Sequence, residues 1–222
     1  MIKHTALKLA FVFFMSFSVA GSAAAYDRGD FQIWNTDYED IKVYKGVRLS
    51  MEQEFRYGEN ASELYYQHYD WGVVFGFDRI LDLGFFYRQV FDRYKKKWRE
   101  EDMPNVNATI KFDLWKFKFD DRNRLEYRHY RYRDDSLRYR NRFSLKYPFD
   151  FKRIKISPYA ADEIFVSSNG TGYNENRFSA GAELEFTKYA RFDLHYMLKE
   201  NRLKDDKWTW ANVLGTKIKI AF

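Results

Sequence analysis

The sequence predicts an all-β chain that forms a single antiparallel transmembrane β-barrel of the outer-membrane type. The first observation is an alternation of apolar and polar residues, with a period of two, that runs through most of the chain. The second is that 21% of the residues are aromatic although 32% are charged and the mean hydropathy is -0.66. This combination is typical of a wall that turns one face to lipid and hides charge inside. The third is the last stretch, residues 208–222, which alternates up to the terminal Phe222 as the closing strand of such a barrel does.

The first 25 residues have the form of a secretory signal peptide. A short basic segment containing Lys3 and Lys8 precedes an apolar run over residues 9–17, and the alanines at 23–25 fit a cleavage site. The apolar run is shorter than the roughly 20 residues that a membrane-spanning helix requires. We therefore expect a signal peptide over residues 1–25 that is removed, and one barrel domain over residues 26–222.

Charge and cysteine content exclude several classes of function. The formal net charge of +6 is mild and falls when Lys3 and Lys8 leave with the signal. Export past the inner membrane argues against nucleic acid as a partner and favours lipopolysaccharide phosphates instead. The chain has no cysteine, so it has neither a disulfide framework nor a thiolate site.

The first half of the chain supplies five alternating segments. In residues 43–57 the odd positions are mostly apolar and the even positions are mostly charged or polar. Residues 65–77, 81–94 and 108–114 repeat this opposition with Asp, Gly and Lys on the polar side, and residues 31–38 form an additional segment. In 65–77 the alternation places Tyr65 on the apolar, outward face.

The second half supplies the two most basic segments, 124–132 and 137–147, followed by four more. Residues 154–166 are less regular, because Pro158 shares a parity with the isoleucines, and we expect a β-bulge near Pro158. The remaining segments are residues 177–186, 191–199 and 208–222.

These segments indicate a barrel of 10–12 strands, with 12 favoured, because antiparallel closure requires an even number. A short further strand near residues 26–30 would give 12, and exclusion of residues 31–38 from the wall would give 10. If the C-terminus is periplasmic, the external connections are those at residues 57, 95, 133, 167 and 203. A soluble β-sandwich would alternate in the same way, but the signal, the aromatic content and the charged inner faces favour the barrel.

The polar faces of the strands should line an enclosed lumen. The residues expected there are Glu52, Glu54, Arg56, Arg88, Glu126, Arg128, Arg138, Arg140, Arg142, Glu163, Arg177 and Glu183. One interpretation is a structural network in which arginines pair with carboxylates and fill a narrow barrel. The other is that the arginine ladder, Arg138, Arg140 and Arg142, is unmatched by nearby acids and passes anionic solutes along a pore wall.

An enzyme is not indicated. A lipid hydrolase needs a nucleophilic serine, a histidine within reach and an orienting polar group. His129 and Asn141 share the lipid-facing parity, but no serine accompanies them there. No His, Asp or Glu spacing stands out as a metal site and no Gly-rich phosphate loop is present, so we expect no catalytic residue, metal or cofactor.

Several motifs carry a resemblance to a known family. They are Leu137-Arg-Tyr-Arg-Asn-Arg-Phe, Ser157-Pro-Tyr-Ala-Ala-Asp-Glu-Ile-Phe, Glu175-Asn-Arg-Phe-Ser-Ala-Gly and the early Phe31-Gln-Ile-Trp-Asn. Over nearly all of the mature chain the sequence resembles the domain of unknown function 2490 family of predicted Gram-negative outer-membrane β-barrels. The resemblance implies an outer-membrane barrel and transfers no substrate or catalytic residue. The interior arginines are also similar in surface chemistry to those of small barrels that admit acidic oligosaccharides.

Taken together, the sequence predicts a monomer in the outer membrane of a Gram-negative cell. It would serve as a structural envelope protein or as a narrow passive pore for small, anionic solutes. The alternatives are a lipid hydrolase and a barrel that binds lipopolysaccharide, for which residues 94–102 provide a charged external tip. The expected partners are membrane lipid, lipopolysaccharide and, through the strand that ends at Phe222, the outer-membrane barrel assembly machinery.

Overall fold

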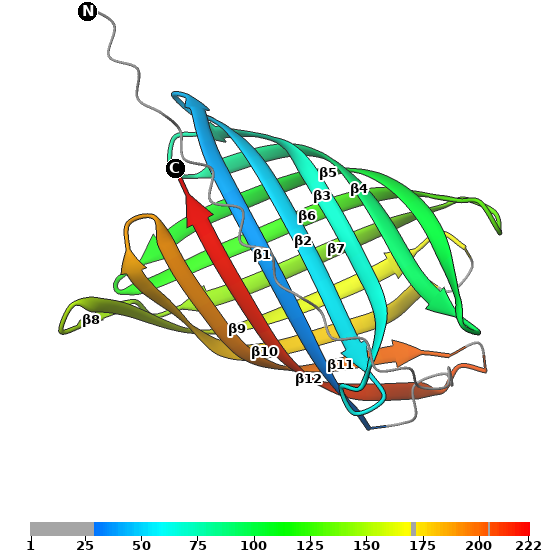
Figure 1. Ribbon diagram of the computed structural model, residues 1–222. Coiled ribbons are helices and arrows are strands. Elements are labelled where there is room, and N and C mark those ends of the chain that lie inside the picture. Colours follow the sequence, from blue (N-terminus) through cyan, green and yellow to red (C-terminus); the bar gives the residue numbers. More distant parts are fainter. Residues whose placement is uncertain (1–28, 170–171, 204) are drawn as a thin grey trace, which may run out of the picture.

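The computed structural model describes residues 29–169, 172–203 and 205–222. The predicted signal peptide, residues 1–25, lies outside these residues. The described part of the chain consists of β-strands and short connections (Figure 1). The strands are β1 (Asp30–Tyr44), β2 (Val47–Gly58), β3 (Glu63–Phe77), β4 (Leu81–Tyr94), β5 (Lys97–Leu114), β6 (Phe117–Tyr130), β7 (Ser136–Lys146), β8 (Phe149–Phe151), β9 (Ile154–Ser167), β10 (Gly172–Thr187), β11 (Ala190–Arg202) and β12 (Trp208–Ala221).

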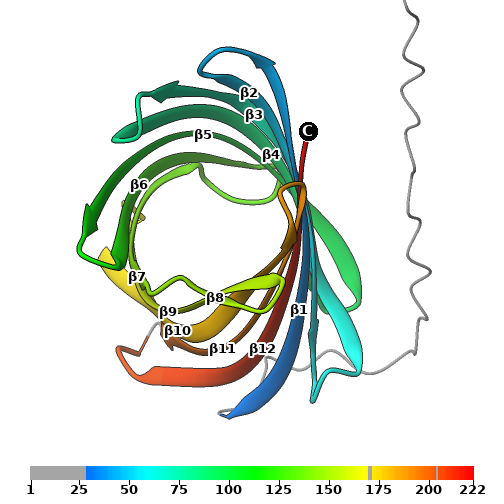
Figure 2. The same cartoon turned by 90° about the vertical axis from the view of Figure 1, so that its left-hand side faces the viewer.

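Eleven of these strands close into a barrel, and the three-residue β8 lies outside the wall, paired with β9. Each strand pairs with its neighbour in the chain, except that β9 follows β7 in the wall. Figure 2 looks onto one end and shows the strands curving around a common interior. The prediction of an all-β barrel of 10–12 strands is confirmed.

The barrel closes through a parallel pair, β1 with β12, and this explains the odd number of wall strands. Their register runs from Asp30 opposite Ala211 to Asp40 opposite Ala221, while the other pairs are antiparallel. A single parallel pair removes the need for an even count. Residues 31–38 therefore belong to a full wall strand, and the twelfth described strand is β8. Residues 26–28 of the further strand expected near residues 26–30 lie outside the described residues.

Parallel closure places Asp30 and Phe222 at opposite ends of the barrel (Figure 1). We name these the N-terminal end and the C-terminal end. The connections at residues 59–62, 95–96, 131–135, 168–171 and 203–207 join strands at the N-terminal end. These are the five connections that the sequence predicts to lie on the same side of the membrane.

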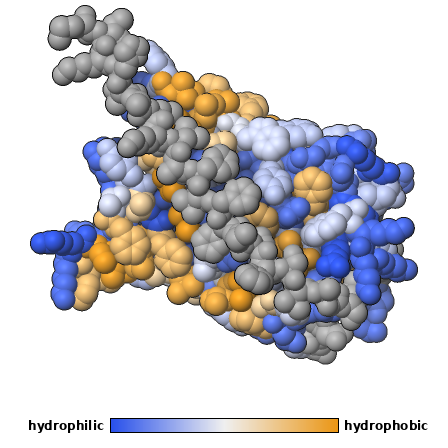
Figure 3. Space-filling model, in the orientation of Figure 1, coloured by the Kyte–Doolittle hydropathy of each residue, from blue (hydrophilic) through white to orange (hydrophobic). Residues whose placement is uncertain are grey.

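Alternation along each strand sends apolar side chains outward and most charged ones inward. Phe75 and Phe85 are exposed on neighbouring strands and lie edge to face, and Phe112 stacks on Phe119 with ring centroids 4.7 Å apart. Such pairs contribute about 0.5–1.5 kcal/mol each. Figure 3 shows apolar residues gathered toward the C-terminal end and hydrophilic residues covering the N-terminal end on the face in view.

Two local predictions are wrong. Pro158 keeps a regular register with Ala182 of β10, so there is no bulge at this position. Instead, β9 changes partner here from β7 to β8, and the Pro158 carbonyl accepts a hydrogen bond from the Tyr147 amide at 3.0 Å. Proline tolerates this position because the ladder on that edge is already interrupted.

The second error concerns Tyr65. The β2–β3 register shifts by one residue between Arg56 and Tyr57, which leaves Tyr65 as an extra residue. A bulge turns the side chain out of strict alternation. The Tyr65 hydroxyl consequently reaches the interior and donates to Gln32 Oε1 at 2.7 Å.

Candidate functional site

The chemistry of the described residues is concentrated in the barrel lumen. All of the lumen residues named from the sequence lie on inner faces of the strands: Glu52, Glu54 and Arg56 on β2, Arg88 on β4, Glu126 and Arg128 on β6, Arg138, Arg140 and Arg142 on β7, Glu163 on β9, and Arg177 and Glu183 on β10. Burying so many charges is costly unless each one is paired. The pairing therefore decides what the lumen can do.

The first ionic cluster joins β6, β7 and β9 around Glu126, which is fully buried. Glu126 accepts from Arg138 Nε at 2.5 Å and from Arg140 Nη1 at 2.9 Å. Arg140 Nη2 also reaches Glu163 Oε1 at 2.9 Å, and Arg122 Nη2 reaches the same oxygen at 2.8 Å. Two members of the arginine ladder are thus matched by acids.

The third member, Arg142, differs. Within the described residues it has no ion-pair or hydrogen-bond partner, although it lies opposite Glu163 in the β7–β9 register and opposite Arg122 in the β6–β7 register. Glu163 is already shared by Arg122 and Arg140. Within the ladder, the unmatched positive charge is therefore at Arg142 alone.

The second cluster links β2, β3, β4 and β12. Arg88 donates twice to Asp70 Oδ2, from Nε at 3.0 Å and from Nη2 at 2.6 Å, and reaches Glu52 at 3.2 Å. Glu52 also contacts His68 Nε2 at 3.2 Å and Lys217 Nζ at 2.6 Å. Since β12 and β2 are separated by β1, the Lys217 contact ties non-adjacent strands together through the interior.

Aromatic rings fill the space between these clusters on the N-terminal side. The Arg56 guanidinium lies 3.6 Å from the ring centroid of Trp34, and Arg177 lies 4.9 Å from Trp34 and 4.4 Å from Phe165. Arg140 lies 4.5 Å from Phe165 on the other side. Cation–π contacts of desolvated arginines contribute up to about 2 kcal/mol each.

The N-terminal half of the lumen is therefore densely packed. Six of its apolar inner residues are no more than 4% exposed: Trp34, Val90, Met103, Phe165, Met197 and Val213. Further pairs lie toward the same end, Arg128 Nε with Glu101 at 2.5 Å and Arg93 Nη1 with Glu63 at 2.7 Å. Eight-stranded barrels are filled by side chains whereas those of 16 strands are open, and this half of the lumen is filled.

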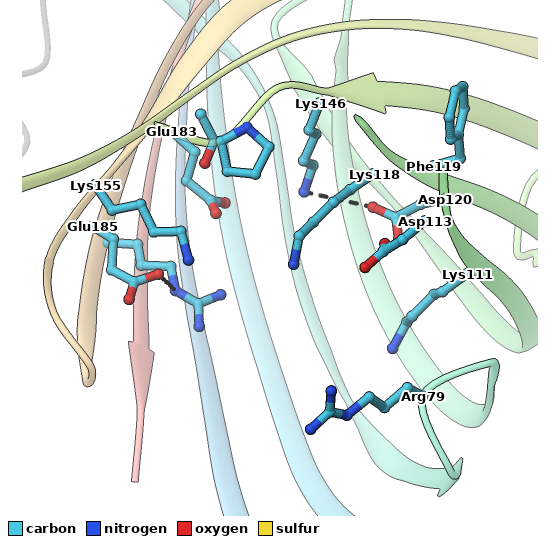
Figure 4. Close-up of a pocket in the computed structure, with 13 residues that line it drawn as sticks. Arg79, Lys111, Asp113, Lys118, Phe119, Asp120, Lys146, Lys155, Glu183 and Glu185 are labelled. Atoms are coloured by element: carbon cyan, nitrogen blue, oxygen red, sulfur yellow. Dashed lines mark ion pairs between the residues drawn. The ribbon is translucent and has the colours of Figure 1, made fainter. Parts of the chain in front are cut away.

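The C-terminal half is hollow. A cavity of about 420 Å³ lies there and is lined largely by charged side chains from several strands (Figure 4). A smaller cavity of about 270 Å³ lies among Arg48, Arg122, Arg124, Lys217 and Lys219 with Glu52, Asp70 and Asp82. The second cavity reaches the ionic clusters near the middle of the lumen.

Sequence reasoning missed several residues that shape the lumen. Asp70 and Lys217 lie on polar parities and could have been included, but their pairing with Arg88 and Glu52 depends on the barrel register. Trp34 and Phe165 could not have been chosen, because an inward aromatic contradicts the rule that assigns rings to the lipid face.

His129 and Asn141, the outward polar residues considered for a hydrolase, have partners of their own. The His129 ring contacts the Asp135 carboxylate at 3.0 Å, and the Tyr127 hydroxyl donates to the same group at 2.5 Å. Asn141 Nδ2 donates to Asp121 Oδ1 at 2.6 Å and to Asn123 Oδ1 at 3.1 Å. His129 and Asn141 are thus engaged with separate partners.

The hydrogen bonds from Tyr127 and His129, together with one from the Tyr130 amide, lower the pKa of Asp135 to about 2. Asp135 lies in the connection between β6 and β7, beyond the strands.

Two further features are absent from the described part of the chain. It contains no group of three or more His, Asp or Glu side chains that could hold a metal ion. It also contains no helix that is long and apolar enough to cross a membrane.

The geometry defines a small closed β-barrel with an apolar outer surface and an ionic lumen that is packed in one half. The chain belongs to the family described as protein of unknown function (DUF2490), whose model matches residues 31–209. The match begins in β1 and ends at the second residue of β12, so it covers the barrel up to the start of its last strand. The resemblance noted from the sequence motifs is therefore confirmed. No curated protein has a significant sequence match to the chain.

Proposed function

We propose that the protein is a non-enzymatic barrel of the Gram-negative outer membrane whose own side chains close its lumen, and that it acts as a structural component of the envelope. The observation that carries this proposal is the pairing of Glu126 and Glu163 with Arg138 and Arg140 beside a packed N-terminal half.

The membrane location is supported by the outer surface. Large apolar side chains exposed on the wall include Trp71, Phe75, Phe85, Val106, Ile110, Leu125 and Ile218. In water such a surface would be an association or aggregation site, whereas in a bilayer it contacts acyl chains. The predicted signal peptide agrees with this location.

The lengths of the strands support one orientation of the barrel in the membrane. A crossing requires about 9–11 residues, whereas β5 has 18 and β10 has 16. The apolar surface lies toward the C-terminal end in Figure 3, so the excess length projects at the hydrophilic N-terminal end. Outer-membrane barrels carry their larger loops outside, and we therefore place the C-terminal end in the periplasm. At the external end, Lys95, Lys96 and Lys97 are exposed and could contact lipopolysaccharide phosphates.

A steadily open anion pore is the competing function. It is favoured by the cationic cavities in the C-terminal half. It is opposed by the packed half, because separating a buried ion pair leaves an uncompensated charge at a cost of roughly 3–5 kcal/mol. Opening a passage past Glu126 would separate at least two such pairs, those with Arg138 and Arg140.

Planar-bilayer conductance of the purified protein tests the proposal. We expect no steady current from the wild type, and transient openings in the variant E126Q/E163Q, which frees the arginines. Arg142→Gln removes a charge without breaking an ion pair and is the matched control, expected to stay closed. A stable, anion-selective wild-type current that falls in R138A/R140A would overturn the structural function in favour of the pore.

The absence of enzymatic activity is tested separately. Purified protein in vesicles is expected to release no fatty acid from phospholipid or lipopolysaccharide. Fatty-acid release that disappears in His129→Ala would establish the hydrolase instead.

A further inference from the structure

Six basic side chains from six different elements converge on the 420 Å³ cavity at the C-terminal end. They are Arg79 from the β3–β4 connection, Lys111 from β5, Lys118 from β6, Lys146 from β7, Lys155 from β9 and Arg191 from β11. Four acidic residues share the lining: Asp113, Asp120, Glu183 and Glu185. The lining thus has two more positive than negative charges.

Two of the cavity cations are paired more loosely than the arginines of the ionic clusters deeper in the lumen. Lys146 Nζ lies 3.6 Å from Asp120, and Arg191 Nε lies 3.4 Å from Glu185. By contrast, Arg138 and Arg140 lie 2.5 and 2.9 Å from Glu126. Lys146 and Arg191 are therefore held less tightly by carboxylates, whereas Lys111 is held by Asp82 at 2.5 Å.

Three of the cations have no carboxylate partner within the described residues: Arg79, Lys118 and Lys155. Figure 4 shows Lys118 and Lys155 extending into the same space from different strands, with Lys146 and Lys111 around it and Arg79 at the edge. Cations that face one another without counterions repel, so their convergence costs free energy unless an anion lies between them.

The second cavity continues the same charge pattern inward. Its lining contains five basic side chains against three acidic ones. Between the low-dielectric walls of a barrel, charges of one sign focus the field and raise the local concentration of counter-ions. Because the N-terminal half of the lumen is packed, this electrostatic field acts inside a pocket with one entrance. Arg79 and Pro148, which lie in connections at the C-terminal end, line the pocket and so place the entrance there.

We propose that this cavity binds a small multivalent oxyanion, with phosphorylated solutes as the class of ligand. A volume of about 420 Å³ lies in the lower part of the range for small-molecule sites, roughly 300–1,000 Å³. Ammonium and guanidinium groups from several directions suit an oxyanion with two or more charges. The inference concerns the lumen of the folded barrel and does not rest on the proposed envelope role.

The probe is inorganic pyrophosphate, titrated calorimetrically into the purified full-length barrel in a neutral detergent at low salt. The variant K118Q/K155Q removes two cavity cations that have no carboxylate partner, and we expect its affinity to fall by on the order of tenfold or more. The matched control is K45Q/K188Q, which removes the same charge from exposed residues in connections that do not line the cavity and is expected to bind as the wild type does.

Retention of the folded, heat-modifiable band in electrophoresis shows that each variant is folded. The proposal is overturned if the wild type does not bind pyrophosphate, or if K45Q/K188Q loses as much affinity as K118Q/K155Q. Neither result bears on whether the barrel conducts ions. The proposed binding site and the proposed closed lumen are therefore tested independently.

Discussion

The imidazole of His195 on β11 lies directly over Gly215 on β12. A β-carbon built on Gly215 would approach His195 Nε2 to 2.1 Å and Cε1 to 2.3 Å. The ring is held in this position because Nδ1 contacts Asp193 Oδ1 at 2.8 Å, and the Tyr159 hydroxyl donates to the same oxygen at 2.9 Å. Because Gly215 has no side chain, the His195 ring of this polar network can occupy the space above it.

Gly215→Ala is expected to displace His195 from Asp193 and to lower the free energy of unfolding by about 1–3 kcal/mol, as overpacking does. Urea unfolding in detergent or vesicles measures it. The double variant G215A/H195A removes the clashing ring and should recover part of the loss. If the single variant is as stable as the wild type, the ring is not confined as described.

Glu126→Gln should destabilise the barrel strongly, by roughly 3–5 kcal/mol, because Arg138 and Arg140 lose a buried counter-charge. The same urea experiment measures the change. Asp78→Asn, at an exposed connection, is the control, with an expected effect within about 0.5 kcal/mol. Equal effects of the two substitutions would show that the cluster contributes nothing specific to stability.

The parallel closure can be tested by cross-linking, since the chain has no native cysteine. Asn35 and Thr216 lie opposite each other on the outer face, with Thr216 Oγ1 2.8 Å from Asn35 Oδ1. N35C/T216C should form an intramolecular disulfide on oxidation, visible as a mobility shift that reductant reverses. N35C/I220C, four residues away in the register, should not. Preferential cross-linking of the second pair would refute this register.

The low pKa of Asp135 has a consequence for pH. A carboxyl whose folded pKa, about 2, lies below its unfolded value stabilises the connection above the unfolded pKa, and this stabilisation is lost as pH falls toward 2. Tyr127→Phe removes a hydrogen bond to the carboxylate and should raise the pKa of Asp135 toward its ordinary value. Carbon-13 NMR titration of the Asp135 carboxyl measures this. An identical titration in the wild type and in Tyr127→Phe would contradict the hydrogen-bonded arrangement.

The alternation of the sequence predicts the wall well, because which face a strand residue occupies depends on local parity. Phe75 and Phe85 are correctly placed outside, and Glu126 and Arg138 inside. The exceptions, such as Tyr65, arise at a register shift that parity does not reveal.

The partners of the lumen charges could not be predicted, because they depend on which strands are adjacent and in what register. The ladder seemed unmatched in sequence, yet Arg140 bridges Glu126 on one side and Glu163 on the other. The parallel pairing of β1 with β12 could not be predicted either, because Asp30 and Ala211 become neighbours only when the sheet closes into a barrel.

The central claim is that the apolar face of the wall contacts lipid while the charged face encloses the lumen. Trp71 is 45% exposed on the outer surface and Trp34 is 4% exposed inside, so single-tryptophan variants that retain one or the other can be reconstituted in vesicles containing brominated phosphatidylcholine. Bromine quenches a tryptophan that contacts acyl chains, and we expect strong quenching of Trp71 and little of Trp34. Quenching of Trp71 by aqueous acrylamide but not by brominated lipid would contradict the claim.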